Sequence, residues 1–311
     1  MLTVPTVPLI APSDIRGDPK RRRRVQILHE TVHEFEEKGA HLTEMAAANL
    51  ERWAAAKSTQ PSTLLGGGMR LEVVQGDLLE TVHEFTKSCG VIFAGLNMAN
   101  ATYPGGGYTT GCTAQEENMA RRTGMHFTFT KENTTSSRND VVYTKPMQEL
   151  IAGKGGVVYL SETPLVCIKG REEWEMDDMG YKRLVDGEVF PFIELRSAAV
   201  DISHLKRVPA KLRANMTGRV RAQFETLKRR GVRHVVLSAF GCGAFGNRPE
   251  DVAAIYKEVL AEFVDALDVV VFAIYYAGHG ENNFDVFHKT LIGSGESQSE
   301  SSGNANGKRP R

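Results

Sequence analysis

Several features that mark other protein classes are scarce or missing in this sequence. No stretch approaches the ~20 consecutive apolar residues of a membrane span, and the apolar N-terminus has neither a preceding basic segment nor a small-residue cleavage pattern. Only four cysteines occur in 311 residues, and none has C-x-x-C spacing. We therefore expect no membrane partner, no signal peptide and no disulfide scaffold, but free thiols in a reducing, intracellular compartment, cytoplasmic or nuclear.

The chain also lacks an excess of charge of either sign. Its 38 Lys and Arg residues balance 38 Asp and Glu residues, so the formal net charge is zero. Proteins that wrap nucleic acid need a basic surface to neutralise phosphates. We expect no direct sequence-specific nucleic-acid binding and a monomeric protein. The 41% hydrophobic residues suffice for a full core in one large domain or two small ones.

The order of apolar segments predicts the fold class. Short apolar runs typical of strands alternate with helical stretches, and several runs are apolar throughout, as in strands covered on both faces. The expected strands are 71–75, 90–96, 157–160, 165–168, 192–198, 234–240 and 268–276, and the expected helices between them are 113–123, 206–230 and 249–266. This alternation predicts a three-layer α/β/α fold with a mixed central sheet.

The segments outside this region have a different composition. We expect a flexible arm over 1–20, which contains four prolines, and an N-terminal helical extension over 21–65. Two helices are expected in that extension, the second over 41–57, and a breaker-rich linker follows them. The main domain is expected over 69–292. Residues 293–311 are too polar to bury a core and are expected to be a disordered tail.

One short motif points to a different chemistry. His29, Glu30 and His33 form an H-E-x-x-H pattern, in which two imidazoles one helical turn apart can bind zinc. The pattern lies in a charged helix without a glycine turn to a third histidine, although His41 could be invoked. A solvated helix face explains it better than a metallopeptidase, and we expect no metal.

Two glycine-rich turns are more informative. In the first, an apolar run ends at Asn97 and Asn100, and the glycines Gly105, Gly106 and Gly107 precede a helix that opens with Gln115-Glu116-Glu117. Consecutive glycines mark a close approach of the backbone, and their N–H groups can bind an oxyanion such as a diphosphate. Two carboxylates beside such a loop can hold ribose hydroxyls and transfer a proton. The alternative is a flexible loop before an ordinary helix with an acidic first turn.

The second turn follows the strand expected at 234–240 and precedes a helix that begins at Pro249. Strand, glycine turn and helix N-terminus form a general phosphate-binding arrangement, so the two loops could hold one diphosphate from both sides. A third strand ends in Gly76-Asp77, and Asp77 could accept a hydrogen bond from an adenine amino group. The candidate ligand-binding residues of the second turn are Gly241, Gly243, Ala244, Phe245, Gly246 and Asn247.

These motifs resemble those of the macrodomain superfamily, and in particular the microbial-type poly(ADP-ribose) glycohydrolases. The matching features are the Gly-Asp after the first strand, the N-x-A-N segment at 97–100, the GGG-x7-QEE signature at 105–117 and the G-C-G-x-F-x-N loop at 241–247. The resemblance runs, with gaps, from about residue 21 to 287. It implies a macrodomain-like fold, hydrolysis of ribose–ribose O-glycosidic bonds with release of ADP-ribose, and no cofactor or metal.

The resemblance also implies residue roles. Glu117 would be the catalytic acid/base, Glu116 would hold ribose hydroxyls, and Asn100 would bind the distal ribose. The glycine loops would hold the diphosphate, with Phe245 packed on the ligand. The charged stretch 170–189 lies outside the matching motifs. The alternative function is a non-catalytic ADP-ribose reader, which would not need the paired glutamates.

Overall fold

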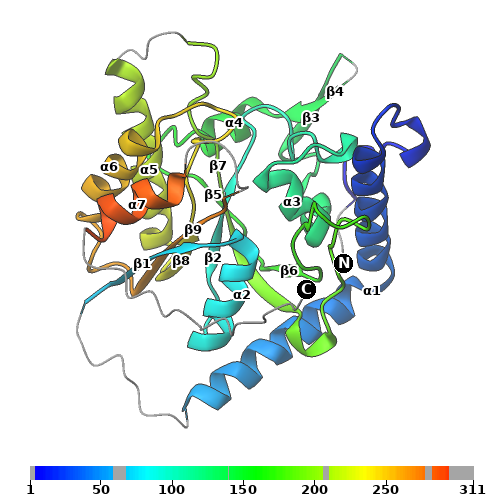
Figure 1. Cartoon of the computed structure of the whole chain (residues 1–311), viewed down its shortest axis with the longest axis horizontal. Coiled ribbons are helices and arrows are strands. Elements are labelled where there is room, and N and C mark those ends of the chain that lie inside the picture. The colour runs from blue at the N-terminus through cyan, green and yellow to red at the C-terminus, as the bar shows by residue number, and fades with distance from the viewer. Residues whose placement is uncertain (1–3, 59–67, 139, 206–209, 277–281, 294–311) are drawn as a thin grey trace, which may run out of the picture.

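The computed structural model describes residues 4–58, 68–138, 140–205, 210–276 and 282–293. Its elements form three layers, with the central sheet between two layers of helices (Figure 1). The helices are α1 (Pro19–Ser58), α2 (Leu78–Cys89), α3 (Gln115–Arg122), α4 (Lys145–Ile151), α5 (Ala210–Arg229), α6 (Pro249–Leu260) and α7 (Asn283–Leu291). The strands are β1 (Arg70–Gln75), β2 (Ala94–Met98), β3 (Thr134–Ser137), β4 (Asp140–Tyr143), β5 (Tyr159–Leu160), β6 (Leu165–Cys167), β7 (Phe190–Ser197), β8 (His234–Leu237) and β9 (Val269–Ile274). Short 3-10 helices are η1 (Pro12–Asp14), η2 (Tyr108–Thr110), η3 (Gly124–Thr128) and η4 (Asp186–Glu188).

The central sheet is mixed. Its strand order is β1-β9-β8-β2-β7-β5, with β6 also paired to β7. The strands from β1 to β7 in this order run parallel, whereas β5 and β6 run antiparallel to β7. The predicted α/β class with a mixed sheet is confirmed. Because β1, β9, β8 and β2 are parallel neighbours, the segments that leave their carboxyl ends meet at one edge of the sheet.

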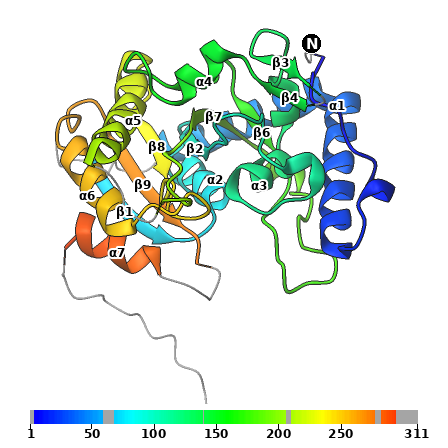
Figure 2. The same ribbon diagram turned by 90° about the horizontal axis from the view of Figure 1, so that it is seen from above.

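Helices cover both faces of the sheet. On one face α2 contacts β2, β8 and β9 and also packs against α1. On the other face α5 and α6 pack together, and α7 joins α6 to β1. Figure 2 shows α5, α6 and α7 together on one side of the molecule and α1 on the opposite side. Strands buried between two helical layers explain the nearly unbroken apolar sequences of β8 and β9.

The N-terminal extension differs from the prediction of two helices. α1 is one helix of 40 residues, and it bends strongly about midway along its length (Figure 1). The segment between the two predicted helices contains Gly39 but no proline, and a single glycine costs a helix only ~1 kcal/mol. The Thr43 hydroxyl also donates to the Gly39 carbonyl at 2.9 Å. The helix therefore continues through the position where the sequence predicted a break.

Helix α1 is part of the main core. Its apolar face contributes buried side chains to the same hydrophobic cluster as the sheet, namely Leu28, Val32, Phe35, Leu42, Ala46 and Trp53. The arm before it also contacts this body, since the Thr6 backbone N–H donates to the Phe129 carbonyl at 2.9 Å and Ile15 is buried. The predicted linker, apart from its two ends, and nearly all of the predicted tail lie outside the described residues.

Several elements were not predicted from the sequence. These are α2, the β3–β4 hairpin, α4 and α7. The residues at both ends of helix α2 are typical helix caps. The Asp77 carboxylate accepts a hydrogen bond from the Glu80 N–H at its start, and Gly90 ends the helix in the left-handed conformation. None of the described helices is long and apolar enough to cross a membrane.

Candidate active site

A cavity of about 610 Å³ opens at the carboxyl edge of the sheet. Its walls come from the segments that leave four neighbouring strands and from the first residues of α3. Gly76 and Asp77 follow β1, Met98 ends β2, Ala239 follows β8 and Tyr275 follows β9. The cavity thus lies where parallel α/β sheets bind ligands, at the ends of strands and near helix N-termini.

Gln115 fixes the start of α3 to the sheet. Its side-chain amide donates to the Leu96 carbonyl at 2.8 Å and accepts from the Met98 N–H at 2.9 Å. Both ends of the amide are therefore bonded to the backbone of β2, although the residue also lines the cavity. We conclude that Gln115 positions α3. Its predicted contact with substrate stays a prediction.

Glu116 is almost completely buried, with 3% of its surface exposed. Its Oε2 accepts a hydrogen bond from the Asn100 backbone N–H at 2.7 Å, and its buried Oε1 has no hydrogen-bond partner among the described residues. Burial, partly offset by the Asn100 hydrogen bond, raises the pKa of Glu116 well above its ordinary value. A buried carboxyl oxygen without a partner is costly for the protein alone and is suited to meet a ligand.

Glu117 is held by the backbone on both oxygens. Its Oε1 accepts from the Gly107 N–H at 2.9 Å, and its Oε2 accepts from the Ala114 N–H at 3.1 Å. Only 8% of its surface is exposed. Ala114 and Asn118 line the cavity, whereas neither glutamate does. The two carboxylates therefore lie beside the cavity and beneath the first glycine loop.

The first glycine loop lies directly on the glutamates. A Cβ added to Gly106 would come within 2.5 Å of Glu117 Oε1 and 3.2 Å of Glu116 Oε2. A Cβ on Gly105 would contact the Tyr108 ring at 2.6 Å, and one on Gly107 would contact the Cys112 thiol at 2.5 Å. Each glycine is thus required by the packing of the loop itself.

This arrangement corrects one expectation. The Gly106 N–H donates to the Tyr103 carbonyl at 3.0 Å, and the Gly107 N–H donates to Glu117. In this structure these two N–H groups are not available to a diphosphate. The sequence correctly indicated a close approach of the backbone, but the approaching group is the pair of carboxylates of Glu116 and Glu117.

The second glycine loop follows β8 and has one open face. The Asn247 side-chain amide donates to the carbonyls of Val200 and Gly241, at 2.8 and 3.0 Å. Gly241 and Gly246 have φ values of 76° and 69°, which favour glycine. Gly243 lines the cavity, and a Cβ there would meet no atom within 4 Å. Asn247 therefore holds the loop in shape, and Gly243 is the position at which a ligand can approach the backbone.

The neighbours of Gly243 differ in exposure. Ala244 is exposed, which is consistent with a ligand contact at the tip of the loop. Phe245 is half-buried and packs against the hydrophobic core, and its carbonyl accepts from the Ile202 N–H at 3.0 Å. Phe245 does not line the cavity in this structure, so its predicted packing on a ligand stays a prediction.

Asp77 lies at the wall of the cavity and has two structural bonds. Its Oδ1 accepts from the Glu80 N–H at 3.0 Å and from Arg122 Nη1 at 2.7 Å. The ion pair with Arg122, whose side chain is 2% exposed, fixes the carboxylate between α2 and α3. The predicted contact with an adenine amino group is compatible with this position and is not tested by it.

The two asparagines near β2 have different surroundings. Asn97 has no exposed surface, and its amide donates to Glu194 at 2.7 Å inside the core. Its Oδ1 has no hydrogen-bond partner among the described residues, and the predicted contact between Asn97 and a substrate stays a prediction. The Asn100 side-chain oxygen accepts from the N–H groups of Thr102 and Tyr103, both at 2.8 Å, which shapes the start of the glycine loop.

Sequence reasoning missed one wall of the cavity. Arg24 from α1 lines it together with Arg171, Glu172 and Trp174, which belong to the charged stretch 170–189. Arg24 donates two hydrogen bonds to Glu172, at 2.9 and 2.7 Å. These two residues are 148 positions apart in the chain, so no local pattern could have connected them.

The histidines of the H-E-x-x-H motif have other partners. His29 Nε2 lies 2.9 Å from the Ile10 carbonyl, and His33 Nε2 lies 3.3 Å from a Glu37 oxygen on the exposed surface. No group of three or more His, Cys, Asp or Glu side chains among the described residues could hold a metal ion. The metallopeptidase alternative therefore has no support in the described part of the chain.

Comparisons with known proteins identify what the chain resembles. Residues 20–149 match the family model for the catalytic domain of microbial-type PARG. The structure is similar to the crystal structure of poly(ADP-ribose) glycohydrolase from Thermomonospora curvata, with a TM-score of 0.59 and 24% identity over 86% of this chain and 98% of that chain. It is also similar to the enzyme from Deinococcus radiodurans in complex with ADP-ribose, with a TM-score of 0.56 and 22% identity over 84% and 92% of the two chains. No curated protein sequence matches significantly.

Proposed function

We propose that this chain hydrolyses the ribose–ribose O-glycosidic bonds of poly(ADP-ribose) and releases ADP-ribose. Residues 20–149 match the family model for the catalytic domain of microbial-type PARG, which supports this proposal. The observation that carries this proposal is the adjacent pair Glu116 and Glu117. Both lie buried beside a cavity at the carboxyl edge of the sheet, and a glycine loop packs on both. A module that only binds ADP-ribose would not need two buried carboxylates there.

The chemistry assigns different work to the two glutamates. Hydrolysis of a glycosidic bond passes through an oxocarbenium-like transition state, in which the leaving oxygen gains a proton and the attacking water loses one. Neighbouring residues on a helix point about 100° apart. Glu117, oriented by two backbone N–H groups, would transfer the proton. Glu116 would use its unpartnered Oε1 to hold a ribose hydroxyl.

Binding of the remaining substrate would use the open faces of the cavity. The diphosphate would lie against the second glycine loop at Gly243 and Ala244, where the backbone is accessible. Rigid placement of the diphosphate would hold the scissile bond near Glu117 and lower the entropic cost of reaching the transition state. No step requires a cofactor. The cellular substrate would be polymer attached to modified intracellular proteins, and we propose that the chain acts as a monomer.

Glu117→Gln tests the proposal. The variant keeps the size of the side chain but cannot transfer a proton at neutral pH, so release of ADP-ribose from automodified polymer should fall by roughly 10²–10⁴. ADP-ribose affinity, measured by calorimetry, should stay within a few-fold. A glutamine oxygen can replace only one of the two hydrogen bonds that Glu117 accepts, so the melting temperature is measured in parallel.

The control is Glu132→Gln, which changes a fully exposed glutamate and should leave rate and affinity unchanged. A parental rate in the folded Glu117→Gln protein would show that the assigned catalytic role is wrong. If the parent binds ADP-ribose but releases none from polymer, the chain is an ADP-ribose reader.

A further inference from the structure

Residues 170–181, here called the rim loop, form a wall of the cavity. The loop folds back on itself, because the Gly170 N–H donates to the Lys182 carbonyl at 2.8 Å and the Tyr181 N–H donates to the Arg171 carbonyl at 3.0 Å. Glu172 and Gly180 also pair as an isolated antiparallel bridge. The sequence offered no role for this charged stretch.

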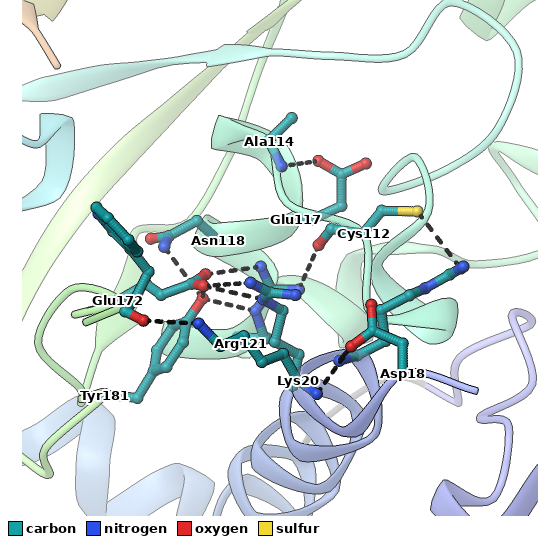
Figure 3. A network of polar contacts seen from close by, with 12 residues as sticks. Asp18, Lys20, Cys112, Ala114, Glu117, Asn118, Arg121, Glu172 and Tyr181 are labelled. Atoms are coloured by element: carbon teal, nitrogen blue, oxygen red, sulfur yellow. Dashed lines mark hydrogen bonds and ion pairs between the residues drawn. The ribbon is translucent and has the colours of Figure 1, made fainter. Parts of the chain in front are cut away.

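A buried polar network fixes the rim loop to α1 and α3 (Figure 3). The Tyr181 hydroxyl donates to Glu172 at 2.8 Å and accepts from Arg121 Nε at 2.7 Å. Arg24 adds a two-pronged hydrogen bond to Glu172, and the side chains of this ion pair are only 9% and 13% exposed. Arg121 has no exposed surface. Charged groups bonded in this way inside a protein hold one geometry, so the loop is a rigid part of the site that also carries the glutamates.

The rim loop presents Trp174 at the cavity. This side chain lines the cavity and is 46% exposed, whereas the other tryptophan, Trp53, is 6% exposed in the core. The Trp174 carbonyl accepts a hydrogen bond from Lys20 Nζ at 3.0 Å, and the same ammonium lies 5.9 Å from the centroid of the Trp174 ring. A large aromatic surface that stays exposed on a rigid loop at a cavity is available to a ligand.

A second contact places the rim loop next to the start of α2, at one end of the cavity. Arg171, three residues earlier, lies with Nε 3.4 Å from Glu80 Oε2 in the first turn of α2. The rim loop therefore meets α2 next to Asp77 and Leu78, which line the same cavity. Together with Ile274 these residues give this end an apolar surface with one carboxylate at its edge. Such a surface suits a flat heterocycle with an exocyclic amino group.

We propose that Trp174 is a specificity-determining residue whose ring stacks on the adenine base of ADP-ribose, and that the rim loop and the N-terminus of α2 together form this base subsite. The inference rests on the proposed function and deepens it. Stacking of a base on an aromatic side chain changes affinity by about 10-fold to 100-fold when the ring is removed. The base would thus anchor one end of the substrate and Gly243 its diphosphate.

The two tryptophans make a direct measurement possible. Titration with ADP-ribose should change the emission of Trp174, and Trp174→Phe should abolish that change while the buried Trp53 still reports a folded protein. Because phenylalanine can also stack, this variant should keep ADP-ribose affinity within a few-fold. Trp174→Ala should weaken ADP-ribose binding by about 10-fold to 100-fold and raise KM for polymer with little change in kcat.

Ribose 5-phosphate separates a base subsite from a general structural effect, because it has no base. Its affinity should be the same in the parent, Trp174→Phe and Trp174→Ala. Met176→Ala is the matched control, since Met176 lies on the same loop, is 36% exposed and does not line the cavity. It should bind both ligands like the parent.

The outcomes distinguish the two proposals. If Trp174→Ala binds ADP-ribose as tightly as the parent, the base subsite is wrong, although the glycohydrolase function stands. If Trp174→Ala weakens ribose 5-phosphate and ADP-ribose equally, the residue acts through the structure of the loop and the stacking proposal is overturned. If the parent binds no ADP-ribose at all, the proposed function fails and this inference fails with it.

Discussion

At the scale of single residues, glycine occupies two positions of the site for different physical reasons. Gly106 has a φ of 58° and lies against both carboxylates, so its lack of a side chain makes room for Glu116 and Glu117. Gly243 has open space where a side chain would be, in the wall of the cavity. The first glycine is required by the protein, whereas the second leaves room for a ligand.

Substitution of these glycines by valine should therefore have different effects. Gly243→Val should fold like the parent and lose most of its ADP-ribose affinity, because the new side chain would occupy the cavity where the diphosphate is expected. Gly106→Val should lower the melting temperature as well, since a left-handed backbone is strained for a β-branched residue and its Cβ overlaps Glu117. Calorimetry and thermal unfolding of both variants check this. Unchanged ADP-ribose binding by a folded Gly243→Val protein would contradict the phosphate position.

Burial of Glu116 should make the stability of the protein depend on pH. Its pKa is raised in the folded protein above the ordinary value of 4.5, chiefly by loss of contact with water. Below pH 4.5 the carboxyl is protonated in the folded and unfolded chains, and it has no pH-dependent effect on stability. As pH rises, the unfolded chain releases the proton first, which favours unfolding until the folded pKa is passed.

Glu116→Gln removes this ionisation and keeps an oxygen that can accept from Asn100. The free energy of unfolding of the variant should therefore increase relative to the parent as pH rises from about 4.5, as measured by urea unfolding at several pH values. A constant difference between pH 4 and 8 would show that Glu116 is not a buried acid with a raised pKa. Its turnover and affinity should both fall, because a ribose contact is weakened.

At the scale of elements, the observed role of α1 differs most from the role predicted from the sequence. The sequence marks it as an extension before the main domain, but it contacts α2, α3, β7 and η2. Its Thr31 hydroxyl donates to the Arg121 carbonyl in α3 at 2.6 Å, and both residues are fully buried. Arg21 reaches the Thr110 carbonyl at 2.9 Å next to the glycine loop. The helix thus supports the element that carries the glutamates.

Leu28→Ala should consequently destabilise the whole protein. Leu28 has no exposed surface and belongs to the main core, and truncation of a buried leucine costs about 2–5 kcal/mol in free energy of unfolding. Glu44→Ala, at an exposed position of the same helix, should change stability by less than about 0.5 kcal/mol. Denaturant unfolding of the two variants gives both values. Equal, small effects would mean that α1 is a separate unit.

At the scale of the whole molecule, the chemistry of the site is expected to use side chains without a metal. The motif at His29 and His33 lies on α1, where His29 contacts the N-terminal arm and the His33 side chain is 67% exposed. His29→Ala and His33→Ala should both keep parental release of ADP-ribose, and a chelator should leave the rate unchanged. Elemental analysis of the purified protein checks for zinc. One zinc per chain that is lost in either variant would restore the metallopeptidase alternative.

The sequence by itself determined the α/β class, the mixed sheet and the two glycine loops, because apolar periodicity and glycine positions act over a few neighbouring residues. It also identified the glutamate pair as the central feature of the site. The continuous α1, the internal roles of Gln115, Asn97 and Asn247, and the wall formed by Arg24, Glu172 and Trp174 were decided only by the tertiary structure. These side chains have hydrogen-bond partners that lie from 17 to 148 residues away in the chain, and a hydrogen bond or a cavity wall exists only once the fold has brought such residues together.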